Sequence, residues 1–223
     1  SVRLAENNPS LFAAIGIHPM DITIPFDHTA LQTLSELALN DRVMAISEVG
    51  LDGLEGAPDT TLQEEVFLAS IQLAKNNSLP IIYHSRETYP RILDILASEG
   101  AQTVGGAAHY FQGDLETAQR CIDLGFFISL ARPLLRMQDL QEVARKIPIE
   151  YIVLETDSYP QHFKKNRQSW TEPRHLAEVA LALAEIKDIP LEQVVQKTSN
   201  NILDMLGSRS KAIKRALEGT FPT

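Results

Sequence analysis

Short apolar runs alternate with longer amphipathic segments along most of the chain. Each run is almost continuously apolar, which is typical of parallel strands buried on both faces. The pattern predicts six strands, over residues 12–17, 43–47, 80–83, 104–108, 125–130 and 151–154. Their alternation with helical segments predicts an α/β fold around a parallel sheet.

The segments between the strands carry apolar residues at helical spacing. Residues 61–76 show a broad apolar stripe that includes Leu62, Val66 and Leu73, and Asp59 offers a side chain that caps this helix. Helical patterns also occupy residues 172–187, 191–206 and 211–218, after the last predicted strand.

Length and composition favour one soluble domain. The 223 residues are 44% hydrophobic, enough for one sizeable core. No apolar run approaches the roughly 18 residues that cross a bilayer, and the first residues lack the order of a signal peptide. We therefore expect a cytoplasmic protein with no membrane partner. The single cysteine, Cys121, lies in a helical pattern and is expected in the core.

The formal charge of −9 argues against broad electrostatic attraction to nucleic acid, because such binding relies on many Lys and Arg contacts with phosphate. It does not exclude a nuclease. Bound metal ions and a few local cations neutralise a phosphate inside a pocket while the remaining surface stays acidic.

Ionisable side chains follow five of the six predicted strands. They are His18, Glu48, His84, His109 and Asp157. The carboxyl ends of parallel strands meet at one rim, so residues far apart in sequence converge there. A lone histidine beside a strand is more often structural, but together these imidazoles and carboxylates form a mixed donor set for a divalent metal ion such as Zn, Mn or Mg.

Five ordered motifs then resemble a known family. They are GIHP at 16–19, SEVGLD at 47–52, YHSRE at 83–87, HYFQG at 109–113 and ETDSYP at 155–160. Their order and spacing are similar to those of the TatD family of metal-dependent deoxyribonucleases. The resemblance extends to about Gly207, where TSNNILDMLG resembles the terminal helix. We therefore divide the chain into a TatD-like hydrolase barrel, 1–207, and a helical tail, 208–223.

The resemblance implies a TIM-like (β/α) barrel that cleaves DNA phosphodiester bonds, often from the 3′ end of single strands. It also implies roles for the metal set. Glu48 resembles the bridging glutamate, His84 and His109 resemble the histidine ligands of one metal, and Asp157 resembles the aspartate that binds metal or orients the attacking water.

Two further residues match positions near the substrate. His18 matches the histidine of the GxHP motif, which faces substrate and assists proton transfer, and Arg86 matches a basic residue suited to bind phosphate. For each of them, a loop-fixing hydrogen bond or ion pair remains an equal alternative.

The family begins with an HxH strand, a helix and a second strand that have no counterpart in this sequence. Six strands are visible where a closed barrel of this type has eight, so the barrel is expected to be incomplete. We expect one or two metal ions per chain, and a full two-metal centre is not expected from this chain alone. Open strand edges would favour a homo-oligomer.

The loop at residues 158–171 offers candidates for substrate binding. Lys164, Lys165 and Arg167 are expected to receive phosphate or simply to be solvated, and Trp170 is expected to pack against the rim or to stack on a base. The leading hypothesis is a TatD-like deoxyribonuclease acting on DNA, particularly single-stranded DNA. The alternatives are a metal hydrolase of another ester or amide, and a shortened, catalytically weak relative that acts as a binding protein.

Overall fold

The computed structural model describes residues 1–23, 27–161, 166 and 170–220. Its sheet has six strands in chain order, and every neighbouring pair is parallel. The strands are β1 (Ala13–Ile15), β2 (Val43–Asp52), β3 (Ile81–Arg86), β4 (Gly106–Ala108), β5 (Phe126–Leu130) and β6 (Ile152–Leu154). The predicted α/β class and the six predicted strands are confirmed.

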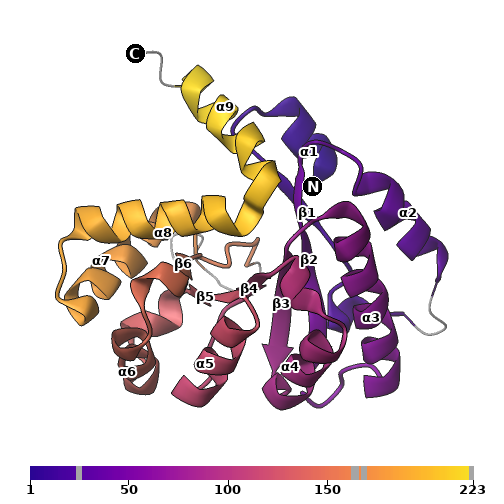
Figure 1. Cartoon of the computed structure of the whole chain (residues 1–223), viewed down its shortest axis with the longest axis horizontal. Coiled ribbons are helices and arrows are strands. Elements are labelled where there is room, and N and C mark those ends of the chain that lie inside the picture. Colours follow the sequence, from indigo (N-terminus) through magenta and orange to yellow (C-terminus); the bar gives the residue numbers. More distant parts are fainter. Residues whose placement is uncertain (24–26, 162–165, 167–169, 221–223) are drawn as a thin grey trace.

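Helices connect consecutive strands and lie on the outer side of the sheet (Figure 1). The α-helices are α1 (Val2–Asn7), α2 (Thr29–Leu37), α3 (Thr60–Asn77), α4 (Tyr89–Ser98), α5 (Leu115–Asp123), α6 (Gln138–Lys146), α7 (Leu176–Lys187), α8 (Leu191–Leu206) and α9 (Ser210–Thr220). Short 3-10 turns are η1 (Pro19–Asp21), η2 (Ala101–Thr103), η3 (Arg132–Leu135), η4 (Ile149–Tyr151), η6 (Pro173–His175) and η7 (Gly207–Arg209). Among the described residues, no helix is long and apolar enough to span a membrane.

The core lies between the sheet and its covering helices. Strand residues such as Ile46, Ile81 and Ile128 are fully buried, and α3 contributes Phe67 and Ile71. Asp59 caps α3 by accepting a hydrogen bond from the backbone N–H of Thr61, as predicted. Cys121 is buried, as expected, and lies 3.0 Å from the Tyr83 hydroxyl.

Two predicted strands continue beyond their apolar runs. β2 reaches Asp52 rather than residue 47, and β3 reaches Arg86 rather than residue 83, so Glu48 and His84 lie within strands and not after them. The reason is that the polar residues Glu48 and His84 interrupt the apolar pattern, whereas backbone pairing continues beyond them and Val49 and Leu51 are again buried. The helix predicted at 172–187 begins as the 3-10 turn η6 and becomes α-helical at Leu176.

A glycine sets the spacing between β2 and β3. Gly50 has φ 142°, and a Cβ atom there would lie 2.1 Å from the carbonyl oxygen of His84. Any side chain would push the two strands apart next to the polar residues that they carry.

One arginine holds the N-terminal segment against the sheet. The Arg42 guanidinium lies 4.1 Å from the centre of the Phe12 ring. Its N–H groups donate to four carbonyl oxygens, those of Ala5, Asn8, Pro9 and Leu11. We call this set of contacts the Arg42 clasp.

The far end of the chain returns to the same region. Arg209 in η7 donates to the carbonyl oxygens of Asn40 and Ala38, at 3.2 and 3.4 Å. Helix α9 follows η7, and α8 packs on β6 (Figure 1). In the described part of the chain, β1 and β6 do not pair with each other, so each has a strand neighbour on one side. The predicted homo-oligomer stays a prediction.

Candidate metal centre and substrate pocket

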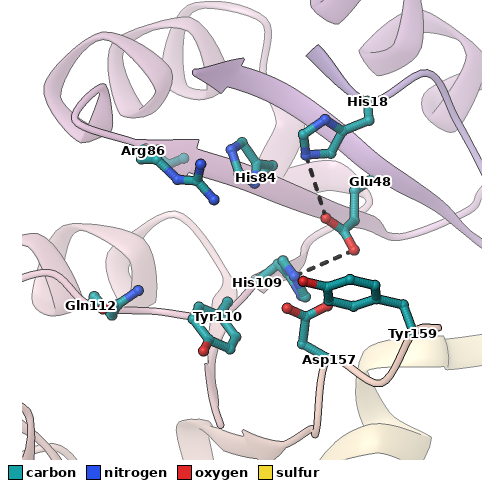
Figure 2. Close-up of a pocket in the computed structure, with 10 residues that line it drawn as sticks. His18, Glu48, His84, Arg86, His109, Tyr110, Gln112, Asp157 and Tyr159 are labelled. Atoms are coloured by element: carbon teal, nitrogen blue, oxygen red, sulfur yellow. Dashed lines mark ion pairs between the residues drawn. The ribbon is translucent and has the colours of Figure 1, made fainter. Parts of the chain in front are cut away.

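A cavity of about 470 Å³ opens at the carboxyl end of the strands (Figure 2). Ten residues line it: His18, Glu48, His84, Ser85, Arg86, His109, Tyr110, Gln112, Asp157 and Tyr159. The structure therefore brings together all four residues of the predicted metal set, together with His18 and Arg86. These residues are spread over 140 positions of sequence, and they meet because parallel strands place their carboxyl ends at one rim.

The elements position each donor differently. Glu48 and His84 project from β2 and β3, whereas His109 directly follows β4. His18 precedes η1 as its N-terminal cap, and Asp157 follows β6 with a left-handed backbone of φ 50°. The register between β2 and β3 shifts between Ile46 and Val49, next to Glu48, so that this carboxylate points into the cavity.

The donor atoms form two groups that share Glu48. His18, Glu48 and His84 form one group, and Glu48, His109 and Asp157 form the other, with the candidate ligand atoms of each group within 4.8 Å of one another. Glu48 Oε2 lies 3.8 Å from His18 Nε2, and Glu48 Oε1 lies 3.3 Å from His109 Nε2. Each carboxylate oxygen of Glu48 thus faces one of the two groups.

The resemblance places His84 and His109 on one metal with Glu48, whereas the two donor groups pair His84 with His18 and His109 with Asp157. The expected division of ligands stays a prediction. Whether one or two ions bind stays a prediction.

Asp52 orients His84. Its carboxylate Oδ2 lies 2.9 Å from His84 Nε2, and its Oδ1 accepts the Leu54 backbone N–H at 3.0 Å. The amide of Gln63 pairs with both the N–H and the carbonyl of Asp52 at 2.7 and 3.1 Å, which fixes the end of β2. With Nε2 occupied by Asp52, His84 presents Nδ1 to the donor group.

Glu155 orients His109 from the opposite side. Its Oε2 lies 2.8 Å from His109 Nδ1, and its Oε1 accepts the Tyr110 backbone N–H at 2.6 Å. This leaves His109 Nε2 directed at Glu48. Carboxylates that hold the outer nitrogen of a ligating histidine fix its tautomer and increase its basicity. Asp52 and Glu155 were not among the predicted site residues, although Asp52 ends the SEVGLD motif and Glu155 begins the ETDSYP motif.

The electrostatics of the site are dominated by clustered carboxylates. Burial raises the pKa of Glu48, and the neighbouring charge of Asp157 raises it further, against the opposing effects of His109 and His18. Burial alone would lower the pKa of His109, but the Glu155 hydrogen bond and the charges of Glu155, Glu48 and Asp157 raise it to about 9. A protonated His109 therefore balances part of the negative charge in the metal-free protein.

His84 has the opposite behaviour. Burial lowers its pKa to about 4, and the Asp52 hydrogen bond offsets only part of that effect. His84 is therefore neutral at physiological pH and has a lone pair available for a metal ion.

His18 and Arg86 complete the polar wall. His18 Nδ1 accepts the Met20 backbone N–H at 3.1 Å, so the neutral ring carries its proton on Nε2, which faces Glu48. In this tautomer Nε2–H can hydrogen-bond to substrate, whereas ligation of a metal ion through Nε2 requires loss of that proton, so the role predicted for His18 stays a prediction. Arg86 Nη1 lies 3.6 Å from Asp52 Oδ2, and its side chain is 53% exposed, so other N–H groups remain accessible from the cavity.

Four lining residues were not predicted site residues: Ser85, Tyr110, Gln112 and Tyr159. No periodicity marks them, although Tyr110 and Gln112 lie within HYFQG and Tyr159 within ETDSYP. Of the predicted substrate contacts, Trp170 is described but is not among the residues that line the cavity. Lys164, Lys165 and Arg167 lie outside the described residues.

The donors fit a divalent metal ion. Imidazole nitrogens and carboxylate oxygens suit Zn and Mn, and the carboxylate-rich group also suits Mg when phosphate oxygens complete the coordination. The donors are partly buried, and both ring-orienting carboxylates accept further hydrogen bonds. Such support is typical of a preorganised metal centre.

Comparison with known proteins gives the family. Residues 1–207 match the family model described as TatD related DNase. The uncharacterized metal-dependent hydrolase YabD of Bacillus subtilis (strain 168) is 34% identical over 206 residues, which cover 90% of this chain and 79% of YabD. Deoxyribonuclease TATDN3 of Homo sapiens is 30% identical over 217 residues, which cover 92% of this chain and 77% of TATDN3.

A solved structure agrees with these sequence matches. The crystal structure of YJJV, a TatD homolog from Escherichia coli K12, superposes with a TM-score of 0.82 at 29% identity, covering 92% of this chain and 80% of YJJV. The predicted TIM-like barrel fold is thereby confirmed by a structural neighbour. Since the family model spans nearly the whole chain and the fold is shared, the chain belongs to the TatD-related DNase family.

Proposed function

We propose that this chain is a metal-dependent deoxyribonuclease that hydrolyses phosphodiester bonds of DNA. The observation that carries the proposal is the pair of donor groups that share Glu48 on the wall of an open cavity, with Arg86 on the same wall. The family match supports this function, as does a relative named as a deoxyribonuclease. The acidic overall charge favours local capture of one phosphate over extended binding of a duplex.

Glu48, His84, His109 and Asp157 would hold the metal, with His18 beside them. Divalent ions bound at such a site polarise the phosphate and activate water for attack at neutral pH. The chain's own contribution is orientation. Asp52 and Glu155 fix the two imidazoles, and their hydrogen bonds hold the donors in place before any ligand arrives.

His18 and Arg86 would act on the substrate itself. The Nε2–H of His18 is directed towards Glu48 in the cavity and is suited to donate a hydrogen bond to a phosphate or leaving-group oxygen. Arg86 has a planar guanidinium that binds two phosphate oxygens at once, and Asp52 holds one end of it. Together they would place the scissile phosphate against the shared Glu48.

A cleavage assay with end-labelled single-stranded DNA tests the proposal. We expect cleavage with Mg, Mn or Zn, none with EDTA, and a loss in kcat/KM of about a thousandfold or more in Glu48→Gln, because the metal supplies several kcal/mol of transition-state stabilisation. Glu116→Gln is the matched control, since Glu116 is exposed on α5 and outside the cavity. Its activity should equal that of the unmodified chain.

Assays of the same protein with other substrates distinguish the alternative functions. Turnover of lactones or amides, with no turnover of any phosphodiester, would assign the chain to another metal hydrolase activity. Binding of DNA without cleavage under every metal condition would instead indicate a binding protein. Either result would reject the deoxyribonuclease proposal.

A further inference from the structure

Half of the cavity wall takes no part in the two donor groups. Besides Arg86, this part of the wall consists of Ser85, Tyr110, Gln112 and Tyr159. It therefore combines a guanidinium with two phenol rings and an amide. A metal centre needs none of the last three, so they are available for another part of the ligand.

Tyr159 is 49% exposed, more than any other Tyr, Phe or Trp among the described residues. Tyr83, by contrast, is fully buried in the core. Figure 2 shows the Tyr159 ring beside Asp157 at the mouth of the cavity. A half-exposed aromatic ring that lines a polar pocket provides an apolar contact surface for a flat ligand.

Tyr110 lies on the same wall and is held rigidly. Its backbone is left-handed, with φ 47°, a conformation that costs a tyrosine free energy unless its surroundings enforce it. Glu155 enforces it by accepting the Tyr110 N–H, and the same carboxylate holds His109. The Tyr110 ring lies 5.9 Å from the His109 ring, centre to centre, so its position is tied to that of a metal donor.

We propose that Tyr110 and Tyr159, with Gln112, form a subsite for one unpaired nucleobase next to the scissile phosphate. The inference rests on the proposed deoxyribonuclease function and assigns to these three residues the contact with the base beside the cleaved linkage. Aromatic rings stack on any base, because every base has a π-face, and the Gln112 amide hydrogen-bonds to its edge. A paired base within a duplex has both faces covered by its neighbours and does not fit this subsite.

Binding of 2-aminopurine tests the subsite without relying on turnover. Stopped-flow fluorescence measures binding of single strands that carry this base at the 3′ or the 5′ end, with ZnCl₂ and a phosphorothioate at the terminal linkage to delay cleavage. We expect quenching on binding and a Kd raised about 10-fold in Tyr159→Leu and in Tyr110→Leu. Tyr159→Phe keeps the ring face and should bind like the unmodified chain.

Two controls make the result specific. Tyr151→Leu removes a tyrosine from η4, which is 39% exposed but does not line the cavity, and should leave the Kd unchanged. A DNA strand that ends in an abasic residue serves as a competitor, and its Kd is obtained from competition with the fluorescent strand. This DNA should bind the unmodified chain, Tyr159→Leu and Tyr110→Leu equally weakly. Absence of quenching, or an equal loss for abasic and normal strands, would overturn the subsite.

The outcomes separate the subsite from the function on which it rests. If the chain cleaves DNA but its affinity is indifferent to both rings, the nucleobase subsite is wrong and the deoxyribonuclease proposal stands. If base-dependent binding is found while no metal supports cleavage, the subsite stands and the catalytic proposal is wrong.

Discussion

Each imidazole on either side of Glu48 is fixed by a carboxylate that lies outside the donor groups. Asp52 occupies Nε2 of His84, and Glu155 occupies Nδ1 of His109, so the two rings present different nitrogens to the centre. The assignment of nitrogens follows from the hydrogen bonds alone. It makes the two carboxylates as important for the geometry of the centre as the ligands themselves.

Replacing either carboxylate by its amide should weaken metal binding. We expect Asp52→Asn and Glu155→Gln each to lower Zn affinity by about 10- to 100-fold, because the histidine loses its orienting acceptor. Isothermal titration calorimetry measures the affinity, and circular dichroism verifies the fold. Asp94→Asn, on the outer surface of α4 in an exposed ion pair with Arg120, is the control. Unchanged affinity in both variants would contradict the orienting role.

Metal binding should depend on pH through His109. Its pKa of about 9 means that a metal ion must displace a proton at neutral pH, whereas His84, with a pKa of about 4, has none to lose. Apparent Zn affinity should therefore rise about tenfold per pH unit from pH 7 and level off above pH 9, with release of about one proton. Calorimetry in buffers of different ionisation enthalpy counts that proton, and a pH-independent affinity would refute the expectation.

The protonation of His109 should also make the free energy of unfolding of the metal-free chain depend on pH. Because folding raises the pKa of His109 from 6.5 to about 9, its contribution to stability is complete below pH 6.5. That contribution is lost as the pH rises through 9. Urea unfolding of the EDTA-treated chain measures this loss as the difference in the free energy of unfolding between pH 6 and pH 10.

At the scale of elements, α8 is joined to the end of the sheet by one buried amide. Asn201 is 5% exposed and donates to the carbonyl oxygens of Ile149 and Ile152, at 2.8 and 2.7 Å. The residue belongs to the TSNNILDMLG segment that resembled the family's terminal helix. Its role in this structure is to join α8 to η4 and β6.

Removing that amide should destabilise the fold. We expect Asn201→Ala to lower the free energy of unfolding by about 2 kcal/mol, because two buried carbonyls lose their donor. Asn200 is the neighbouring exposed asparagine in α8, so Asn200→Ala should change stability by less than about 0.5 kcal/mol. Urea unfolding measures both variants, and an equal effect of the two would refute the role assigned to Asn201.

Strand ends were the part of the elements that the sequence did not predict. Apolar runs located the buried interior of β2 and β3, since burial is what hydrophobicity reports. The polar residues Glu48 and His84 interrupt the apolar pattern, although β2 continues through the buried Val49 and Leu51 to Asp52 and β3 continues to Arg86. Backbone pairing is independent of side-chain polarity, so the predicted strands ended before the functional residues.

At the scale of the whole molecule, the strand order and the meeting of the site residues could both be predicted. Repeated βα units give neighbouring parallel strands, and their carboxyl ends share one rim. The pairing of donors could not be predicted. It depends on the register shift beside Glu48 and on the rotation of each imidazole, which Asp52 and Glu155 set through contacts 32 and 46 residues apart in sequence.

The Arg42 clasp has a consequence for how the molecule opens. Helix α1 buries only Val2 and Ala5, so much of its attachment depends on the guanidinium that joins four carbonyls of the N-terminal segment. A segment held by so few contacts forms its own cooperative unit, with a smaller opening free energy than the sheet. Amide hydrogen exchange in α1 should then proceed by local opening, during which β2 to β5 stay folded and keep Glu48, His84 and His109 in place. Amides of β2 to β5 should exchange only through global unfolding.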